Sequence, residues 1–532
     1  MIVGRSLDAI FDESVDRAEK ELTTIPLEAI HELGISKTHN DLLGSHTVVT
    51  YPPLDALVRI GGDRLFDALQ FQPQVDTYLH IPYCEYPCKF CPYTTLNVGG
   101  KDSEGMGSYF EALKTEIKNW AVKLRSQESK VRSMYIGGGT PFALSTDSLE
   151  DLLSFVRNTL PFTDSSEICV ETSPKATIAG DTQEKLVILK KYGITRISIG
   201  IQSFDFETLR DTARTFRGHT TTDEARAVRI LLESGIPNIN VDMIQDLPIL
   251  SKTNLDRLKQ DLIKIAELRP QHVTWYNLRL RPETSYVRIS PRLPNEQDSL
   301  LTRLTIWNFM ESAGYLVQEG DRFVLGEKYE DRFRKTRGSV ETDLLGIGVS
   351  AYSHVYPAFF QNSRVIGGNV RSDSRVAVKN YVEAVRRNGN AITSGYKMTE
   401  DEILAGKFAL GLKRGVDLRE LHDTLSISPE THAYNNLILN RETKLIDVGL
   451  LGVSPEGILG FTRTGRLFEN EICARFYTPR AIYLGHMNRG TVTDEIDRNL
   501  SDYEGVIAVN QAINEPSNHP IIDRLPYVEN VV

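Results

Sequence analysis

The chain has 532 residues, a formal net charge of −10, 40% hydrophobic residues and 25% charged residues. This length exceeds one compact core and predicts two to four domains, and the acidic balance gives no support to nucleic-acid or membrane-surface binding. No stretch reaches the roughly 18 apolar residues of a membrane-spanning helix, and the first residues lack a basic or hydrophobic signal region. We therefore expect a protein of the reducing cytoplasm.

Residues 1–75 form a charged, helical-looking N-terminal extension that closes with Tyr51-Pro52-Pro53 and an apolar segment. From Asp76 onward, short β-rich runs alternate with amphipathic segments of helical period. The predicted strands are Thr77–Ile81, Met134–Ile136, Glu167–Val170, Arg196–Ile199, Asn238–Ile244 and His272–Leu278. The predicted helices are Tyr109–Leu124, Ser148–Thr159, Gln183–Tyr192, Thr222–Ser234 and Asn254–Leu268.

Six β/α units in a row over residues 76–290 predict parallel strands with right-handed crossovers, hence an α/β fold with a partial (β/α)6 barrel. The site of such a fold lies at the carboxyl ends of the strands. Residues 291–395 are expected to add an α/β extension. Residues 396–477 predict helices followed by a small hairpin, which is a winged-helix-like domain, although without the basic stripe of a DNA-binding module. Residues 478–532 form a polar tail that we leave unassigned.

Three of the five cysteines lie within eight residues, directly after the first predicted strand: Cys84, Cys88 and Cys91. Three thiolates alone complete neither a closed zinc site nor a fully ligated electron-transfer cluster. The CxxxCxxC spacing favours a 4Fe–4S cluster with one open iron, which can bind a substrate or a cofactor. A zinc site completed by His80 is the alternative, and the low cysteine content disfavours a disulfide. His80 itself could orient a carbonyl of the cysteine loop or fill a hydrogen bond of the barrel.

Polar and glycine-rich positions stand at the ends of the following strands. The run Gly137-Gly138-Gly139-Thr140 follows the second strand, where glycines let the backbone approach a ligand and present N–H groups to a carboxylate. Glu171 ends the third strand, Gln202 ends the fourth and Asp242 lies in the fifth. Each alone is typical of an ordinary turn or barrel residue. Together, at successive strand ends, they favour a single site.

These motifs resemble the radical SAM superfamily and, within it, the group related to oxygen-independent coproporphyrinogen III oxidase. The resemblance covers about residues 50–475. It rests on Tyr78-x-His-Ile-Pro-x-Cys84, the cysteine loop with Phe90 before its last cysteine, Gly137-Gly-Gly-Thr-Pro141, Glu171-x-x-Pro174, Arg196-x-Ser-x-Gly-x-Gln202-Ser-Phe, Asn240-Val-Asp242-x-Ile-x-x-Leu-Pro248 and the C-terminal module.

The resemblance implies that Cys84, Cys88 and Cys91 are the catalytic cluster ligands, and that the open iron chelates S-adenosylmethionine (SAM). It implies that Arg214 pairs with a carboxylate and that Asp242 accepts from ribose hydroxyls. The full set of implied SAM contacts is Tyr78, Phe90, Gly138, Gly139, Thr140, Glu171, Gln202, Arg214 and Asp242. One electron from a donor such as flavodoxin or ferredoxin would cleave SAM to a 5′-deoxyadenosyl radical, which abstracts hydrogen from a small-molecule substrate.

Three members of the group compete. Tyr93 stands where the oxidases carry a further cysteine, and residues 332–343 lack the His-Asn-x-x-Tyr-Trp signature of the heme chaperones. The Tyr51-Pro-Pro lead-in and the segment Leu344–Ser353 resemble radical SAM methylases and cyclopropanases. We therefore expect methylation or cyclopropanation of an sp² carbon, with a second SAM molecule and possibly a partner methyltransferase. The alternatives are a coproporphyrinogen III dehydrogenase or other tetrapyrrole-processing enzyme, and a non-enzymatic heme chaperone.

Overall fold

The computed structural model describes residues 5–40, 42–43, 50–86, 88–216, 218–248, 254–281, 284, 292–329, 331–333, 342–363, 370–417, 419 and 443–491. A 13-stranded sheet, a three-stranded sheet and a two-stranded pair organise these residues. The predicted tail is described only as far as residue 491, and most of it lies outside the described residues.

The six predicted parallel strands are confirmed, and they lie side by side in chain order at the centre of the large sheet. Every neighbouring pair among them is parallel. The strands are β2 (Gln74–Ile81), β5 (Lys130–Gly138), β6 (Phe162–Thr172), β7 (Arg196–Gln202), β8 (Asn238–Gln245) and β9 (His272–Asn277). The fold is therefore the α/β fold that the alternating pattern predicts, with all six carboxyl ends at one edge of the sheet.

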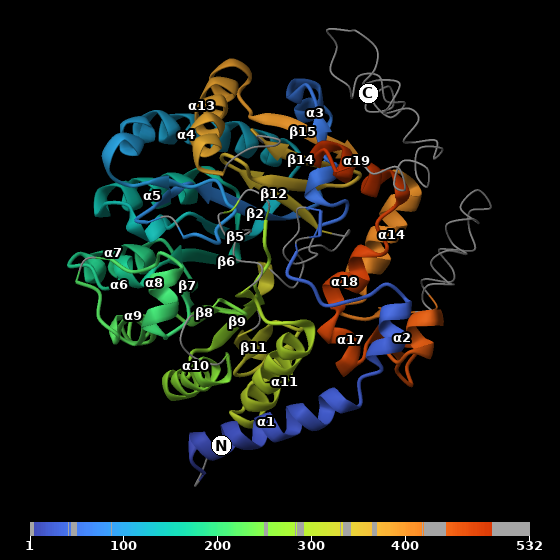
Figure 1. Ribbon diagram of the computed structural model, residues 1–532. Helices are drawn as coiled ribbons and strands as arrows, with labels where there is room; N and C mark the ends of the chain where they lie inside the picture. Colours follow the sequence, from blue (N-terminus) through green and yellow to red (C-terminus); the bar gives the residue numbers. More distant parts are fainter. Residues whose placement is uncertain are drawn as a thin grey trace.

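The five predicted helices are also confirmed and lie outside the sheet (Figure 1). In α5, Ser145 caps the first turn by accepting from the Ser148 N–H, and the buried leucines follow at helical spacing. The helices are α4 (Met106–Ser126), α5 (Thr146–Thr159), α7 (Thr182–Lys191), α9 (Asp223–Leu232) and α10 (Asn254–Leu268). Shorter helices of the same region are α6 (Pro174–Thr177) and α8 (Phe206–Asp211).

The sheet continues beyond the six strands on both sides. A seventh parallel strand, β12 (Asp343–Ile347), pairs with the free side of β2. Antiparallel strands extend each edge: β13 (Tyr352–Val355), β14 (Ala358–Asn362), β15 (Ile392–Lys397) and β1 (Val58–Arg59) beyond β12, and β11 (Arg322–Val324) and β10 (Leu316–Gln318) beyond β9. The strands expected as an α/β extension thus belong to the same sheet as the barrel strands.

Helices from the N-terminal extension and from residues beyond 295 pack beside this sheet (Figure 1). Helix α1 (Leu7–Thr23) packs against α11 (Glu296–Ser312), and α13 (Val370–Asn388) packs against α4. The remaining helices of the extension are α2 (Leu27–Glu32) and α3 (Gly62–Ala68). The division of the chain into separate domains stays a prediction.

The C-terminal module begins at α14 (Glu400–Gly411), where Thr399 and Glu402 form a capping box. A small antiparallel sheet follows, with strand order β16 (Val416–Asp417), β18 (Ile458–Phe461) and β17 (Leu451–Val453). The helices that follow β18 in the described part of the chain are α17 (Arg463–Leu467), α18 (Glu469–Ala474) and α19 (Pro479–Arg489), the last of which lies within the predicted tail. Residues 418 and 420–442 of the predicted winged-helix-like domain lie outside the described residues. Among the helices that the structure describes, none has the length and apolar character to cross a membrane.

Candidate functional site

The cysteine loop begins where β2 ends. Cys84 lies in β3 (Tyr83–Cys84), which pairs with β4 (Leu96–Asn97), and Cys88 and Cys91 lie in the loop between these two short strands. The Val98 N–H donates to the Cys84 carbonyl at 2.9 Å, and the Cys91 N–H donates to the Cys88 carbonyl at 3.3 Å. The first of these bonds closes the base of the loop, and the second forms a turn within it.

The three cysteines are half-buried, and their thiols influence one another electrostatically. Burial raises the pKa of Cys84 well above its ordinary value, and the neighbouring Cys91 adds to the effect. Burial and the nearby Cys88 likewise raise the pKa of the Cys91 thiol to about 12. Such thiols stay protonated until a metal replaces their protons, because a coordinated cation stabilises the thiolate.

Two polar side chains already contact these sulfurs. Thr140 Oγ1 donates to Cys84 Sγ at 3.6 Å, and Arg214 Nη1 donates to Cys88 Sγ at 3.0 Å. Three cysteines with hydrogen-bond donors around them suit an iron–sulfur cluster, in which such donors surround the ligand sulfurs. In the described part of the chain, no three His, Cys, Asp or Glu side chains are already gathered around one metal position. The three thiols and the donors around them suit a cluster, and ligation of a cluster by these cysteines stays a prediction.

The glycine run at the end of β5 is required by close packing within the protein. A Cβ at Gly137 would lie 2.5 Å from the Glu171 carboxylate, and a Cβ at Gly139 would lie 2.5 Å from the Tyr83 carbonyl oxygen. Gly138 has a φ of +99°, and a Cβ at this position would collide with the His80 ring. Its N–H donates to Glu171 Oε2 at 2.9 Å. The N–H that we expected to face a ligand is thus held by Glu171, which the sequence placed at the same strand edge.

His80 connects β2 to the end of the cysteine loop. Its Nε2 lies 3.0 Å from the Thr94 carbonyl oxygen and therefore carries the proton, while Nδ1 accepts from the Tyr78 hydroxyl at 3.1 Å. Burial lowers the pKa of His80 to about 4, so the ring is neutral. Of the two roles left open for His80, the structure shows the one that orients a carbonyl of the cysteine loop. Tyr78 lies beside it on the inner face of the sheet.

At the end of β7, Gln202 and Arg214 lie near Gly200. Gln202 has a φ of +72°, unusual for a residue with a side chain, and its buried Oε1 has no hydrogen-bond partner among the described residues. Arg214 Nη2 donates to the Gly200 carbonyl. Such a strained residue with a buried, unpartnered acceptor is typical of a ligand-binding position.

Asp242 lies in a row of polar side chains that crosses three strands. Its Oδ2 accepts from Ser198 Oγ at 2.7 Å and its Oδ1 from Asn240 Nδ2 at 2.9 Å. Thr274 Oγ1 on β9 donates to Asn240 Oδ1 at 3.1 Å. Ser198 and Asn240 belong to motifs that the sequence shows, but neither of them, nor Thr274, was predicted to have a role in the site. Their signal was the two-residue period of the strands, which puts them on the same face as Asp242.

Phe90, in the cysteine loop, packs against an apolar cluster at the ends of β8 and β9 rather than against the polar row. The buried members of this cluster are Ile244, Leu247, Leu278 and Leu280. The predicted site residues therefore divide into a sulfur side with Thr140 and Arg214, a polar inner face with Asp242, and an apolar pad beneath Phe90.

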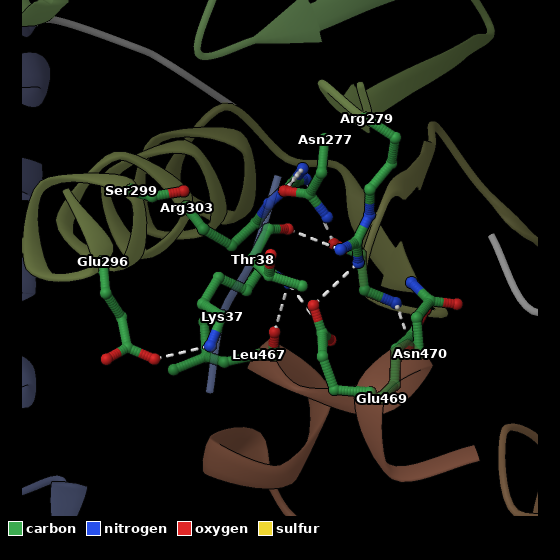
Figure 2. A network of polar contacts seen from close by, with 12 residues as sticks. Lys37, Thr38, Asn277, Arg279, Glu296, Ser299, Arg303, Leu467, Glu469 and Asn470 are labelled. Carbon is green, nitrogen blue, oxygen red and sulfur yellow. Dashed lines mark hydrogen bonds and ion pairs between the residues drawn. The ribbon is translucent and has the colours of Figure 1, made fainter. Parts of the chain in front are cut away.

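A network of hydrogen bonds and ion pairs, which the sequence did not predict, links the N-terminal extension to residues near this apolar cluster (Figure 2). Lys37 Nζ donates to the Leu467 carbonyl at 2.5 Å, and Arg279 pairs with Glu471 at 2.7 Å. The Leu280 N–H donates to the His39 carbonyl at 2.5 Å. The segment of residues 37–40 thus joins the end of β9 to the C-terminal module. Its members are hundreds of positions apart, so no local pattern could reveal it.

Comparisons with known proteins show which superfamily and fold this chain shares. Residues 78–262 match the family described as the Radical SAM superfamily. The heme chaperone HemW of Bacillus subtilis is 26% identical over 75% of this chain and 98% of its own length. HemW of Escherichia coli is 30% identical over 53% of this chain and 71% of its own length. The solved structure of E. coli coproporphyrinogen III oxidase (HemN), described as a radical SAM enzyme, has a TM-score of 0.67 and 24% identity, and covers 81% of this chain and 96% of that chain.

These relatives contradict the expected methylation or cyclopropanation, since none of the three is named a methylase or a cyclopropanase. The two features that favoured that branch, the Tyr51-Pro-Pro lead-in and the segment Leu344–Ser353, contribute to the packing of the fold. The buried Tyr51 hydroxyl donates to the Phe476 carbonyl at 2.9 Å and accepts from the Thr478 N–H at 3.1 Å, and Leu344–Ile347 forms most of β12. Nothing supports the second SAM molecule, and the expected partner methyltransferase loses its basis with the methylation reading.

Proposed function

Because this chain belongs to the radical SAM superfamily, among the relatives of coproporphyrinogen III oxidase HemN and heme chaperone HemW, we propose that it is a SAM-cleaving enzyme that oxidises a tetrapyrrole of the coproporphyrinogen type. When bound, a 4Fe–4S cluster supplies the electron that splits SAM into methionine and a 5′-deoxyadenosyl radical. That electron comes from an external one-electron donor. The observation that supports the proposal is that the cysteine loop follows β2, that Glu171 and Gln202 lie at the carboxyl ends of β6 and β7, and that Asp242 lies in the adjacent β8 of the same parallel sheet.

In this proposal the protein residues bind and orient SAM. Cys84, Cys88 and Cys91 hold the cluster, and the unpartnered Oε1 of Gln202 accepts from SAM. Ser198 and Asn240 hold the Asp242 carboxylate in place so that it can accept further hydrogen bonds from ribose hydroxyls. A side chain that is held before the ligand arrives loses little conformational entropy on binding.

The names of the relatives suggest the substrate class, and the inner face of the sheet is compatible with it. Tyr78 and Tyr135 stack with ring centroids 6.3 Å apart, and Phe333 stacks on Tyr135 at 5.4 Å. Aromatic side chains on β2 and β5 and a polar row on β7, β8 and β9 of the same sheet suit a large, flat molecule that carries carboxylates. We therefore expect the tetrapyrrole to lie over this inner face, with the oxidised side chain toward the cysteine loop.

The test is an anaerobic reaction of reconstituted protein with SAM, a one-electron reductant and coproporphyrinogen III. We expect 5′-deoxyadenosine and methionine together with a decarboxylated porphyrinogen, and none of these products from the Cys91→Ala variant. The matched control is Cys473→Ala, since Cys473 is buried in α18 and donates to the Ala409 carbonyl. Turnover of SAM without any change in the porphyrinogen would contradict the substrate assignment. Equal turnover in both variants would contradict the site.

Heme carriage is the second candidate, and it is favoured by the HemW relative whose whole length this chain nearly spans. The stretch expected to differ from that group, residues 332–343, lies largely outside the described residues. Titration with heme separates the two functions. Tight one-to-one heme binding, with no effect of coproporphyrinogen III on SAM cleavage, would favour the carrier.

A further inference from the structure

The connector that follows α8 is hydrogen-bonded to the cysteine loop at three points. The Lys89 N–H donates to the Thr212 carbonyl at 3.1 Å, and Lys89 Nζ donates to the Asp211 carbonyl at 2.7 Å. The third contact is the one from Arg214 Nη1 to Cys88 Sγ at 3.0 Å. Two segments more than 100 residues apart are therefore joined directly at a predicted cluster ligand.

Local backbone geometry directs the Arg214 side chain inward. Ala213, just before it, has a left-handed φ of +59°, a conformation that costs free energy for a residue with a Cβ. The Arg214 N–H then donates to the Leu209 carbonyl at 2.8 Å, and its Nη2 donates to the Gly200 carbonyl. The residue is only 7% exposed. Its guanidinium is thus held from both ends against the sulfur.

The charge of Arg214 has no carboxylate partner within 4 Å among the described residues. Glu224, a nearby acid, is paired with His219 at 2.9 Å, and the Tyr86 ring lies 5.6 Å from the guanidinium carbon. Glu85 and Glu224 act on this cation electrostatically, but without an ion pair at contact distance its burial is still costly, because it loses its hydration. A thiolate at Cys88, such as a metal ligand must be, supplies the missing negative charge.

We propose that Arg214 is a positioning residue that sets the reduction potential of the cluster through Cys88. This inference rests on the proposed function, because it requires a cluster on the three cysteines. Three thiolates give a 4Fe–4S cluster a net negative charge, and reduction by one electron from the external donor, with no proton transferred, makes it more negative. A fixed cation and an N–H···S hydrogen bond stabilise the reduced form more than the oxidised form, so they raise the potential. This role differs from the contact with the SAM carboxylate that the family resemblance implies.

The experiment is a redox titration, monitored by electron paramagnetic resonance, of anaerobically reconstituted protein without SAM. For Arg214→Gln we expect the midpoint reduction potential of the cluster to be lower by at least 59 mV. For a one-electron couple this shift makes the ratio of reduced to oxidised cluster ten times smaller at the same solution potential. Arg214→Lys keeps the charge but loses the planar fork, so it should fall between Arg214→Gln and the unaltered protein. Arg210→Gln is the matched control. Arg210 is an exposed arginine of α8, and its replacement removes the same charge without touching a sulfur.

Iron and sulfide content and the binding constant for SAM are measured on the same samples. If Arg214→Gln fails to assemble a cluster, the shift of Arg214→Lys relative to Arg210→Gln decides the matter. A full cluster with unchanged midpoints in both Arg214 variants, and weaker SAM binding instead, would overturn the inference and leave the proposed function standing. Absence of a cluster in the unaltered protein would overturn both, which distinguishes the two failures.

Discussion

The two faces of the parallel strands differ in chemistry although the same strands build both. On the face that meets the helices, Ile199 and Val241 are completely buried in the main apolar core. On the opposite face, Ser198, Asp242 and Thr274 belong to a polar row. Side chains alternate between the two faces along a strand. The apolar side chains on one face can therefore stabilise the fold, while the polar side chains on the other can bind a ligand. A substitution should therefore affect either stability or SAM chemistry, according to the face it changes.

The largest effect is expected on the helix-facing side. Ile199→Ala removes fully buried methyl groups and leaves a cavity, so the free energy of unfolding should fall by about 2–5 kcal/mol. Chemical denaturation of the cluster-free protein measures this change. The binding constant for SAM, measured well below the unfolding transition, should stay within about twofold. A large loss of SAM affinity with unchanged stability would contradict the claim that this face contributes to stability and not to SAM binding.

The second-largest effect is expected from a substitution on the inner face. Asp242→Asn removes the charge that accepts from Ser198 and Asn240 and that we expect to accept from SAM. Hydrogen bonds to a charged group contribute about 1.5–3 kcal/mol, so SAM affinity should fall about 10- to 100-fold. Equilibrium binding to the reconstituted protein provides the measurement. Asp151→Asn, an isosteric change at an exposed residue of α5, is the control and should leave binding unaltered. Equal affinities of the two variants would remove Asp242 from the site.

Asp261, a buried acid of α10, should make the free energy of unfolding depend on pH. Burial raises the pKa of Asp261 to about 7, although it accepts from the Phe204 N–H at 2.6 Å. The folded state then holds this proton more tightly than the unfolded state, so the contribution is present below about pH 4 and is lost as the pH rises to about 7.

The Asp261→Asn variant tests this sign. Its free energy of unfolding should decrease less between pH 4 and pH 7 than that of the unaltered protein, by on the order of 2 kcal/mol. Denaturant titrations at several pH values supply the comparison. Parallel curves for the two proteins would show that Asp261 is ionised in the folded state throughout this range.

The smallest effect is expected from Thr274→Val, which deletes the single hydrogen bond from Thr274 to Asn240. A neutral hydrogen bond contributes about 0.5–1.5 kcal/mol, and Asn240 keeps its bonds to Ser198 and Asp242. We expect a small loss of stability and at most a several-fold loss of SAM affinity. An effect as large as that of Asp242→Asn would mean that the polar row acts as one cooperative unit.

The strands and helices of the six β/α units were predictable because each depends on a local repeat of apolar residues. Helix α10 begins and ends where its pattern predicts, and β7 needed only a short extension. Strand β12 was not recognised as a barrel neighbour. Its pairing with β2 joins residues about 270 positions apart, and nothing in either segment encodes that partner. The Tyr51-Pro-Pro motif likewise gives no indication that the Tyr51 hydroxyl contacts Phe476, which lies 425 positions further along the chain.

The sequence by itself determined the cysteine loop, the glycine run and the polar strand ends, because spacing and residue type specify which ligands and backbone conformations are available. Only the tertiary structure decided what each group contacts. It assigned the Gly138 N–H to Glu171 and turned Arg214 toward a cysteine sulfur. Such choices depend on burial and on partners far away along the chain, and hydrogen bonds and charges inside a protein are satisfied by whatever the fold brings within reach.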